Sequence, residues 1–244
     1  MLEVHTLSKR FGGLHAVRDV TLSVPKGQIV ALIGPNGAGK TTTFAMIAGF
    51  IRPDSGTITF EGHDITGLRP DRIAEAGMVR TFQITQPFAG LTVAENIRVG
   101  AFLRTPSPRD ATANARAIGT TLGLAPFLDR PAASLTVAGR KRLEVARALA
   151  TSPRLLLLDE VMAGLNPAEI HDIVAMIRTI RDSGVTILLI EHIMQAVAAL
   201  ADDVYVLAQG SLIAQGPPRA IADHPAVIEA YLGRGAAAKL AAHA

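Results

Sequence analysis

The segment from Gly34 to Thr41 carries residue types suited to holding a chain of phosphates. Its sequence, GPNGAGKT, matches the pattern G-x-x-x-x-G-K-[ST]. Glycines let the backbone curl round an anion with successive N–H groups pointing inward, and Lys40 would add a positive charge on the β- and γ-phosphates. Thr41 would offer its hydroxyl to Mg²⁺. The residues expected to surround the phosphates are Gly34, Pro35, Asn36, Gly37, Ala38, Gly39, Lys40, Thr41 and Thr42.

The surroundings of this segment favour a phosphate loop over an ordinary glycine-rich turn. The residues before it, Gln28–Ile33, form a continuous apolar run, which is typical of a strand buried on both faces. The residues after it, Lys40–Gly49, predict a helix whose positive end would face the same phosphates. A strand, a glycine-rich loop and a helix in this order are the context that the motif requires.

Two adjacent carboxylates, Asp159 and Glu160, suit the chemistry of hydrolysis. They follow the four leucines of Leu155–Leu158, so we expect them at the C-terminal edge of a central strand, beside the phosphate loop. Asp159 would coordinate Mg²⁺ through water, as in other P-loop nucleotidases, and Glu160 would orient or deprotonate the attacking water. The alternative, two acids that merely end a strand facing solvent, leaves their coincidence with a phosphate loop unexplained.

The elements that must position these residues are predicted to be strands alternating with helices. Apolar runs predict strands over Arg154–Asp159, Val185–Ile190 and Val204–Leu207, and helical spacing predicts a helix over Gly139–Thr151. This alternation implies a parallel sheet with right-handed crossovers. Shorter segments between turn signals predict three further strands, Leu2–Thr6, Val20–Val24 and Thr57–Glu61.

The chain is therefore predicted to be an α/β protein with a P-loop NTPase core of the RecA type. This core would have a mostly parallel central sheet, joined to an antiparallel β part and a helical lobe. We place the lobe at about residues 91–150, where helical spacing, alanine-rich segments and the breaker cluster Thr105–Pro108 replace the apolar strand pattern. Residues 1–232 are expected to form a single domain, and residues 233–244 a flexible tail.

Composition argues against several classes of function. The chain has no cysteine, which excludes a disulfide framework and a thiolate metal site. The longest apolar runs are far shorter than the roughly 20 residues of a membrane-spanning helix. The net charge is only +3, and 19 of the 24 basic residues are arginines scattered along the chain. A nucleic-acid partner is not expected, because its binding surface would gather such residues on one stripe with aromatic residues between them.

Over residues 2–232 the chain resembles the ABC ATPase family, which carries both motifs above and several further residues at matching positions. Phe11 lies where the family places an aromatic residue that stacks on adenine, and Val17 falls within the same ATP site. Gln83, in VRTFQ, lies where the family has a glutamine that contacts Mg²⁺ and the attacking water. His192, in LLIEH, resembles the histidine that contacts the γ-phosphate. Taken singly, Phe11 also fits a core residue, and His192 fits a surface or capping residue.

The resemblance implies ATP and Mg²⁺ as the bound cofactors. It assigns catalysis to four residues, Lys40, Gln83, Glu160 and His192. It assigns Mg²⁺ contacts to Thr41, Gln83 and Asp159.

The family's signature segment, usually L-S-G-G-Q at a helix N-terminus, is represented here by Leu135, Thr136, Val137, Ala138 and Gly139. Thr136 keeps a hydroxyl, and the backbone N–H groups of a helix start do not depend on the side chains, so an anion site is still expected. Val137 and Ala138 add β-carbons where the family usually has glycines, and Gly139 lacks the glutamine side chain. In the family this segment completes the ATP site of a second subunit.

A second departure from the family pattern follows Glu160. Val161 replaces the proline that is common after the catalytic glutamate. The family's D-loop corresponds to Ala163, Gly164, Leu165 and Asn166, with asparagine in place of the usual aspartate.

Three stretches resemble the subgroup of ATPases that drive importers of branched-chain amino acids. They are GMVRTFQITQPFAGLTVAENI, AGLNP and VYVLAQGSLIAQGPPRAIADHPAVIEAYLG. This resemblance implies a second, homologous ATPase subunit, two transmembrane permease subunits and, indirectly, a substrate-binding protein. It also implies a peripheral position on the cytoplasmic face of the inner membrane. Related importers carry amides, urea or other amino acids.

Two other classes of function fit the sequence less well. A soluble ABC-type ATPase of DNA repair or translation would usually carry long coiled coils, zinc motifs or a second ATPase domain, and none of these is visible in the sequence. A GTPase or a small-molecule kinase would leave the segment from Leu135 to Glu160 unexplained, and no NKxD-like motif for guanine is present.

Overall fold

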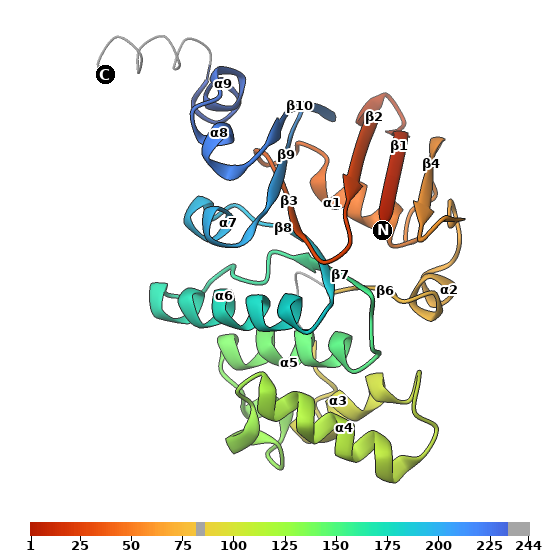
Figure 1. The fold of residues 1–244 in the computed structure, drawn as a ribbon, viewed down its shortest axis with the longest axis vertical. Helices are drawn as coiled ribbons and strands as arrows, with labels where there is room; N and C mark the ends of the chain where they lie inside the picture. The colour runs from red at the N-terminus through yellow and green to blue at the C-terminus, as the bar shows by residue number, and fades with distance from the viewer. Residues whose placement is uncertain (82–85, 234–244) are drawn as a thin grey trace. The chain divides into compact units, whose positions relative to one another are not determined.

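The computed structural model describes residues 1–81 and 86–233, which fold into two compact units. The first unit joins Met1–Pro70 to the residues from Thr186 onward, and the second unit is Asp71–Val185. Each unit contains both strands and helices (Figure 1). Gln83 and residues 234–244 of the predicted tail lie outside the described residues.

An antiparallel sheet in the first unit has the strand order β2-β1-β4-β5. At the end where Leu2 of β1 pairs with Val24 of β2, buried apolar side chains alternate with exposed polar ones, so one face of this part of the pair packs inward. The three predicted strands of this region are confirmed, and the strand that begins at Leu2 and the strand that ends at Val24 extend several residues beyond their predicted ranges. The strands are β1 (Leu2–Phe11), β2 (Leu14–Val24), β4 (Ser55–Phe60) and β5 (His63–Asp64).

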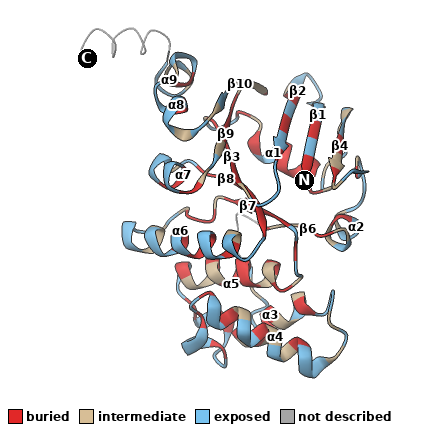
Figure 2. Cartoon of the chain, in the orientation of Figure 1, coloured by how far each residue is buried: buried red, intermediate tan, exposed pale blue. Residues whose placement is uncertain are grey.

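A second group of strands in the first unit is mostly parallel. Strand β3 (Ile29–Ile33) pairs in parallel with β8 (Thr186–Ile190) and with β9 (Asp203–Ala208), and β10 (Ser211–Gly216) adds to β9 in the antiparallel direction. All five residues of β3 and all five of β8 are buried, as the apolar runs Ile29–Ile33 and Ile187–Ile190 predict. Figure 2 shows burial along the chain. The helices of this unit are α1 (Lys40–Ile47), α7 (Met194–Leu200), α8 (Pro218–Ala222) and α9 (Pro225–Leu232).

The second unit holds one parallel strand pair and most of the longer helices. Strand β6 (Met78–Arg80) pairs with β7 (Leu155–Asp159), and all five residues of β7 are buried. Between residues 91 and 150 the described elements are helices and short 3₁₀ turns, the region assigned to the helical lobe. The helices of this unit are α2 (Pro70–Glu75), which begins at its boundary, α3 (Val93–Ala101), α4 (Pro108–Thr121), α5 (Val137–Leu149) and α6 (Pro167–Asp182).

The predicted α/β class is confirmed, with mostly parallel buried strands, a separate antiparallel sheet and helices. Among residues 1–81 and 86–233, no helix has both the length and the apolar character needed to cross a bilayer.

Candidate nucleotide site

The phosphate loop is a close-packed turn between β3 and α1 in the first unit. Gly34 and Gly39 have positive φ angles of 150° and 104°, in the range that favours glycine. A β-carbon at Gly34 would overlap the carbonyl oxygen of Leu207, and one at Gly39 would overlap that of Ala16. The path of the loop is therefore set by backbone packing against β9 and β2, and these two glycines cannot be replaced without moving that backbone.

Lys40 opens α1 and reaches back across the loop that precedes it. Its side chain is buried, and Nζ donates to the carbonyl oxygens of Gly34 at 2.7 Å and Pro35 at 3.0 Å. An ammonium held by two uncharged carbonyls can exchange them for phosphate oxygens, which are stronger acceptors because they are charged. The glycine-lined turn, the lysine and the helix start together fit a polyphosphate group.

The other predicted nucleotide contacts of the first unit lie on α1, β2 and β1. Thr41 is exposed and Thr42 half-buried on the first turn of α1. Val17 of β2 is buried beside Gly39, whereas Phe11 at the end of β1 keeps 47% of its surface exposed, with the Lys9 ammonium 5.7 Å from its ring centre. Because Phe11 is partly open to solvent, its ring can stack on a base, whereas the ring of a core phenylalanine could not.

His192 lies at the same edge of the parallel strands as the phosphate loop. It is exposed and follows β8 by two positions, and β8 is the parallel neighbour of β3, from which the loop emerges. The carboxyl ends of adjacent parallel strands form the ligand-binding edge of open α/β sheets. The structure thus places the predicted phosphate loop and the predicted γ-phosphate histidine on one edge of the first unit.

Tyr231 of α9 also contacts the phosphate loop, which the sequence did not predict. Burial raises the pKa of its hydroxyl, and a hydrogen bond with the backbone of Gly34 opposes part of that rise. The net shift is upward, so the hydroxyl stays protonated at neutral pH. The C-terminal helix therefore touches the first residue of the glycine motif.

The second unit presents the two predicted carboxylates at the end of β7. Asp159 is buried, and its Oδ2 accepts a 2.6 Å hydrogen bond from Nη2 of Arg80, whose side chain is also buried. The adjoining Glu160 is half-buried and adopts a left-handed backbone conformation, with φ of 48°. Arg80 was not predicted from the sequence as a site residue. A charged side chain in the short apolar segment before Gln83 could have indicated it.

The signature segment forms the N-terminus of α5 in the second unit. The Thr136 hydroxyl accepts a 3.1 Å hydrogen bond from the N–H of Gly139, so it caps its own helix. Leu135 and Ala138 are buried, and Val137 is 47% exposed. The helix starts at Val137 rather than at Gly139 as predicted, because this cap supports two further residues. The exposed helix start is consistent with a segment that faces a ligand outside its own unit.

The predicted D-loop, Ala163–Asn166, ends in the N-terminal cap of α6. Asn166 Oδ1 accepts from the N–H of Glu169 at 3.0 Å, and Glu169 Oε2 accepts from the N–H of Asn166 at 2.9 Å. This reciprocal pair is a capping box, which asparagine supports as well as aspartate. The departure from the family's usual aspartate therefore keeps the helix start intact.

Replacing Asn166 by alanine is expected to lower the free energy of unfolding by about 0.5–2 kcal/mol, because the cap of α6 is lost. Asn166→Asp should retain full stability, since a carboxylate accepts the same hydrogen bond. Urea unfolding followed by circular dichroism measures both changes. Equal stability of the alanine and aspartate variants would show that this cap does not stabilise the protein.

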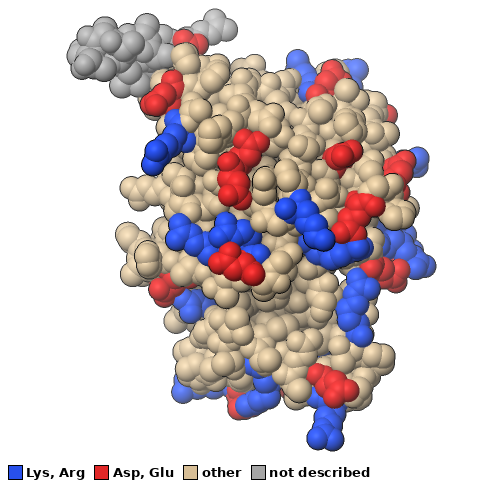
Figure 3. Space-filling view, viewed as in Figure 1, with Lys and Arg blue, Asp and Glu red and all other residues tan. Residues whose placement is uncertain are grey.

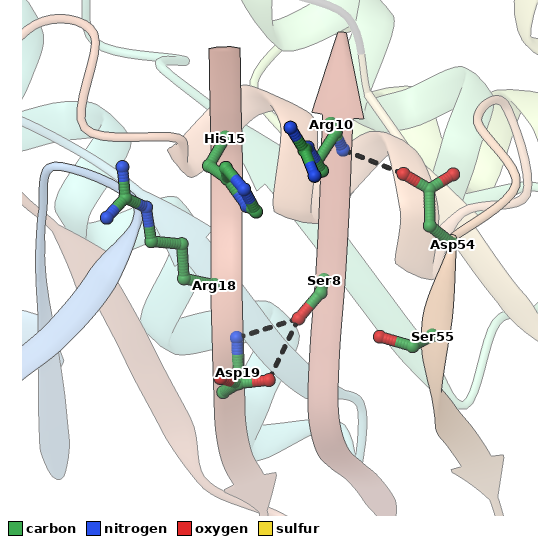
Figure 4. Close-up of a pocket in the computed structure, with 7 residues that line it drawn as sticks. All are labelled: Ser8, Arg10, His15, Arg18, Asp19, Asp54 and Ser55. Carbon is green, nitrogen blue, oxygen red and sulfur yellow. Dashed lines mark hydrogen bonds between the residues drawn. The ribbon is translucent and has the colours of Figure 1, made fainter. Parts of the chain in front are cut away.

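A pocket of about 300 Å³ in the first unit lies on the antiparallel sheet (Figure 4). Its acidic groups are engaged locally: Asp19 accepts from Ser8 Oγ, and Asp54 accepts from the N–H of Arg10 and from Lys9. The lining residues are Ser8, Arg10, His15, Arg18, Asp19, Asp54 and Ser55, and no predicted ATP contact is among them. Acidic and basic side chains are interspersed over the face drawn in Figure 3.

Comparison with known proteins identifies the family. The sequence model of the ABC transporter family matches residues 17–163, which include the phosphate loop, both carboxylates and the signature segment. This chain belongs to the ABC transporter family. A further model, that of the branched-chain amino acid ATP-binding cassette transporter, matches residues 211–237 at the C-terminal end of this family member.

Relatives of this ABC family chain match it over nearly its whole length. It is 43% identical to the high-affinity branched-chain amino acid transport ATP-binding protein BraF of Pseudomonas aeruginosa, with 96% of this chain and 98% of BraF covered. It is also 43% identical to the high-affinity branched-chain amino acid transport ATP-binding protein LivG of Escherichia coli, with 96% of this chain and 98% of LivG covered. The predicted family is therefore confirmed.

Two solved structures are similar to this ABC family chain. A nucleotide-free ATP-binding cassette from an ABC transporter superposes with a TM-score of 0.88 at 34% identity, covering 96% of this chain and 99% of the other. The ADP conformation of an ATP-binding cassette gives 0.87 at the same identity and coverage. These likenesses agree with the fold described above.

Proposed function

We propose that this chain is the ATP-binding and ATP-hydrolysing subunit of an ABC importer for branched-chain or other hydrophobic amino acids. The observation that carries the proposal is the full-length similarity to BraF and LivG, both described as branched-chain amino acid transport proteins. The match at residues 211–237 supports the same subgroup from a separate part of the chain. A soluble ABC-type ATPase of DNA repair or translation is not favoured, because these relatives are transport proteins.

In this proposal each predicted site residue has a role in hydrolysis. The phosphate loop and Lys40 hold the β- and γ-phosphates, and Glu160 orients the attacking water. Phe11 and Val17 contact the nucleoside, and His192 contacts the γ-phosphate. Gln83, which lies outside the described residues, would contact the metal and the water.

Mg²⁺ would be held through Thr41 and Asp159. An exposed hydroxyl on the first turn of α1 and a carboxylate at a strand end are oxygen donors, the ligands that Mg²⁺ prefers. When bound, the metal neutralises charge that develops on the transferring phosphoryl group.

The working form is proposed to be a two-subunit clamp on the cytoplasmic face of the inner membrane. The exposed start of α5 contacts ATP held by a homologous second ATPase, and two permease subunits bind the pair. ATP closes the clamp, and hydrolysis removes the anion that bridges the subunits, so the clamp opens. A substrate-binding protein delivers the amino acid on the other side of the membrane.

Reconstitution in liposomes tests this function. The chain, its partner ATPase and the permease subunits are combined with the substrate-binding protein, and ATPase activity is measured with leucine, isoleucine, valine, lysine or glutamate. We expect several-fold stimulation by the branched-chain amino acids and little by lysine or glutamate. Absence of stimulation by any amino acid, or sedimentation of the native protein with ribosomes or DNA rather than membranes, would contradict the proposal.

A further inference from the structure

Lys141 is a buried lysine on the helix that begins at the signature segment. It lies in the second turn of α5, is 6% exposed, and its Nζ donates to the carbonyl oxygen of Glu160 at 3.2 Å. Lysine is almost never buried to this extent unless its ammonium is paired with acceptors, because an unsolvated charge is unfavourable. The contact joins the start of α5 to the main chain of the proposed hydrolytic residue within the second unit.

The carbonyl that Lys141 contacts belongs to an unusual turn. Glu160 has a φ of 48°, a left-handed conformation that residues with a β-carbon rarely adopt, and glutamate has no side-chain device that favours it. The same carbonyl accepts a second hydrogen bond, from the N–H of Ala163 at 3.2 Å. Two donors on one oxygen fix the peptide plane between Glu160 and Val161.

The hydrogen bonds to the Glu160 carbonyl oxygen matter more because residue 161 is valine and not proline. A proline at position 161 would fix its own φ and so stiffen the chain immediately after Glu160. Valine supplies no such restraint, although its side chain is buried against the core of the unit. The orientation of the peptide between residues 160 and 161 therefore depends on hydrogen bonds to its oxygen, and Lys141 provides one of them from a different element.

We propose that Lys141 is a positioning residue for ATP hydrolysis, acting through the main chain of Glu160. Its ammonium holds the left-handed turn, which fixes the direction in which the Glu160 side chain leaves the backbone. Displacement of a reacting group by about 1 Å can lower a rate about 100-fold, so a small rotation of this peptide has a large effect. The inference rests on the proposed role of Glu160.

Substitution of Lys141 tests this inference. Lys141→Met keeps the length of the side chain without its donors, and it should lower kcat for ATP about 10- to 100-fold. The KM and the equilibrium affinity for a fluorescent Mg·ATP analogue should stay within about twofold, because Lys141 contacts neither phosphate nor base in the proposed site. Lys141→Arg, which restores a cationic donor, should recover most of the rate.

The matched control is Arg142→Met, one position further along the same helix. Arg142 forms a 2.8 Å ion pair with Asp172 of α6, on the surface, and does not contact Glu160 through any described hydrogen bond. Loss of this ion pair should leave kcat within about twofold of the wild-type value, since surface ion pairs contribute little to stability. An equal loss of kcat in this variant would indicate a general effect of α5 and would overturn the assignment to Lys141.

Combination with Glu160→Gln separates positioning from a structural role. Because Lys141 acts through Glu160, adding Lys141→Met to Glu160→Gln should cause no further loss of rate and no loss of ATP-driven dimer formation. Additive losses, or weaker Mg·ATP binding by Lys141→Met alone, would overturn the inference. If Lys141→Met fails to fold, Lys141→Leu also removes the donors. A kcat lowered at unchanged KM in Lys141→Leu would support the inference, and a wild-type kcat in that variant would overturn it.

Different results would contradict the two proposals, the catalytic role of Glu160 and the positioning role of Lys141. Wild-type hydrolysis by Glu160→Gln removes the proposed role of Glu160 itself. An inactive Glu160→Gln together with a fully active Lys141→Met leaves Glu160 in its role and removes only the positioning role of Lys141.

Discussion

Replacing Glu160 by glutamine is expected to lower ATP hydrolysis about 100- to 10,000-fold while Mg·ATP still binds. The amide has the shape of the carboxylate but cannot accept the proton of the attacking water, and general-base catalysis contributes a factor of this size. Lys40 and the phosphate loop, which are proposed to hold the nucleotide, are unchanged. Single-turnover hydrolysis of radiolabelled ATP measures the loss, and size-exclusion chromatography with ATP detects the closed dimer that should accumulate.

The matched control for this substitution is Glu169→Gln in the same unit. Glu169 accepts the N–H of Asn166 in the capping box of α6, and a glutamine oxygen can accept the same hydrogen bond. The control variant should hydrolyse ATP at a rate within about twofold of the wild-type protein. Hydrolysis by Glu160→Gln at the rate of the control would remove Glu160 from the proposed mechanism.

The sequence predicted those strands that are buried on both faces. Residues 29–33, 155–158 and 187–190 are uninterrupted apolar runs, because a strand covered on both sides has little solvent-facing surface to carry polar residues. Strand β10, SLIAQG, was missed because every one of its residues is at least partly exposed, and β6 was missed because three residues are too few to show a period.

The same reasoning explains which parts of the site could be predicted. The phosphate loop, Asp159 and Glu160 were found because their chemistry requires residue types at fixed spacing along the chain. Arg80 and Lys141 contact these carboxylate residues from elements 79 and 19 positions away in sequence. Such contacts are created by the pairing of β6 with β7 and by the packing of α5, and no local pattern records them. The roles assigned to the nucleotide-binding and catalytic residues remain predictions.

Breaking the buried pair between Arg80 and Asp159 is expected to be among the most destabilising single changes in the second unit. Their side chains are 9% and 2% exposed, so Arg80→Met leaves a carboxylate charge buried without its guanidinium partner. Loss of one member of a buried ion pair costs about 3–5 kcal/mol. Urea unfolding monitored by circular dichroism should show a lower midpoint for Arg80→Met, with a slope close to that of the wild-type protein.

Two companion variants show whether the loss of stability in Arg80→Met comes from the unpaired, buried carboxylate of Asp159. Arg80→Met combined with Asp159→Asn removes both charges and should recover most of the lost free energy, which gives a large coupling energy in a double-mutant cycle. Arg116→Met breaks the pair with Asp129, whose side chains are 46% and 78% exposed, and should leave the unfolding midpoint close to that of the wild-type protein, because solvent screens an exposed ion pair. If the double variant is as unstable as Arg80→Met alone, the guanidinium stabilises the unit through packing, and Asp159 does not depend on it as a counter-ion. Recovery in the double variant would instead mean that the carboxylate proposed to hold Mg²⁺ is held in place by its ion pair with Arg80, three residues before Gln83.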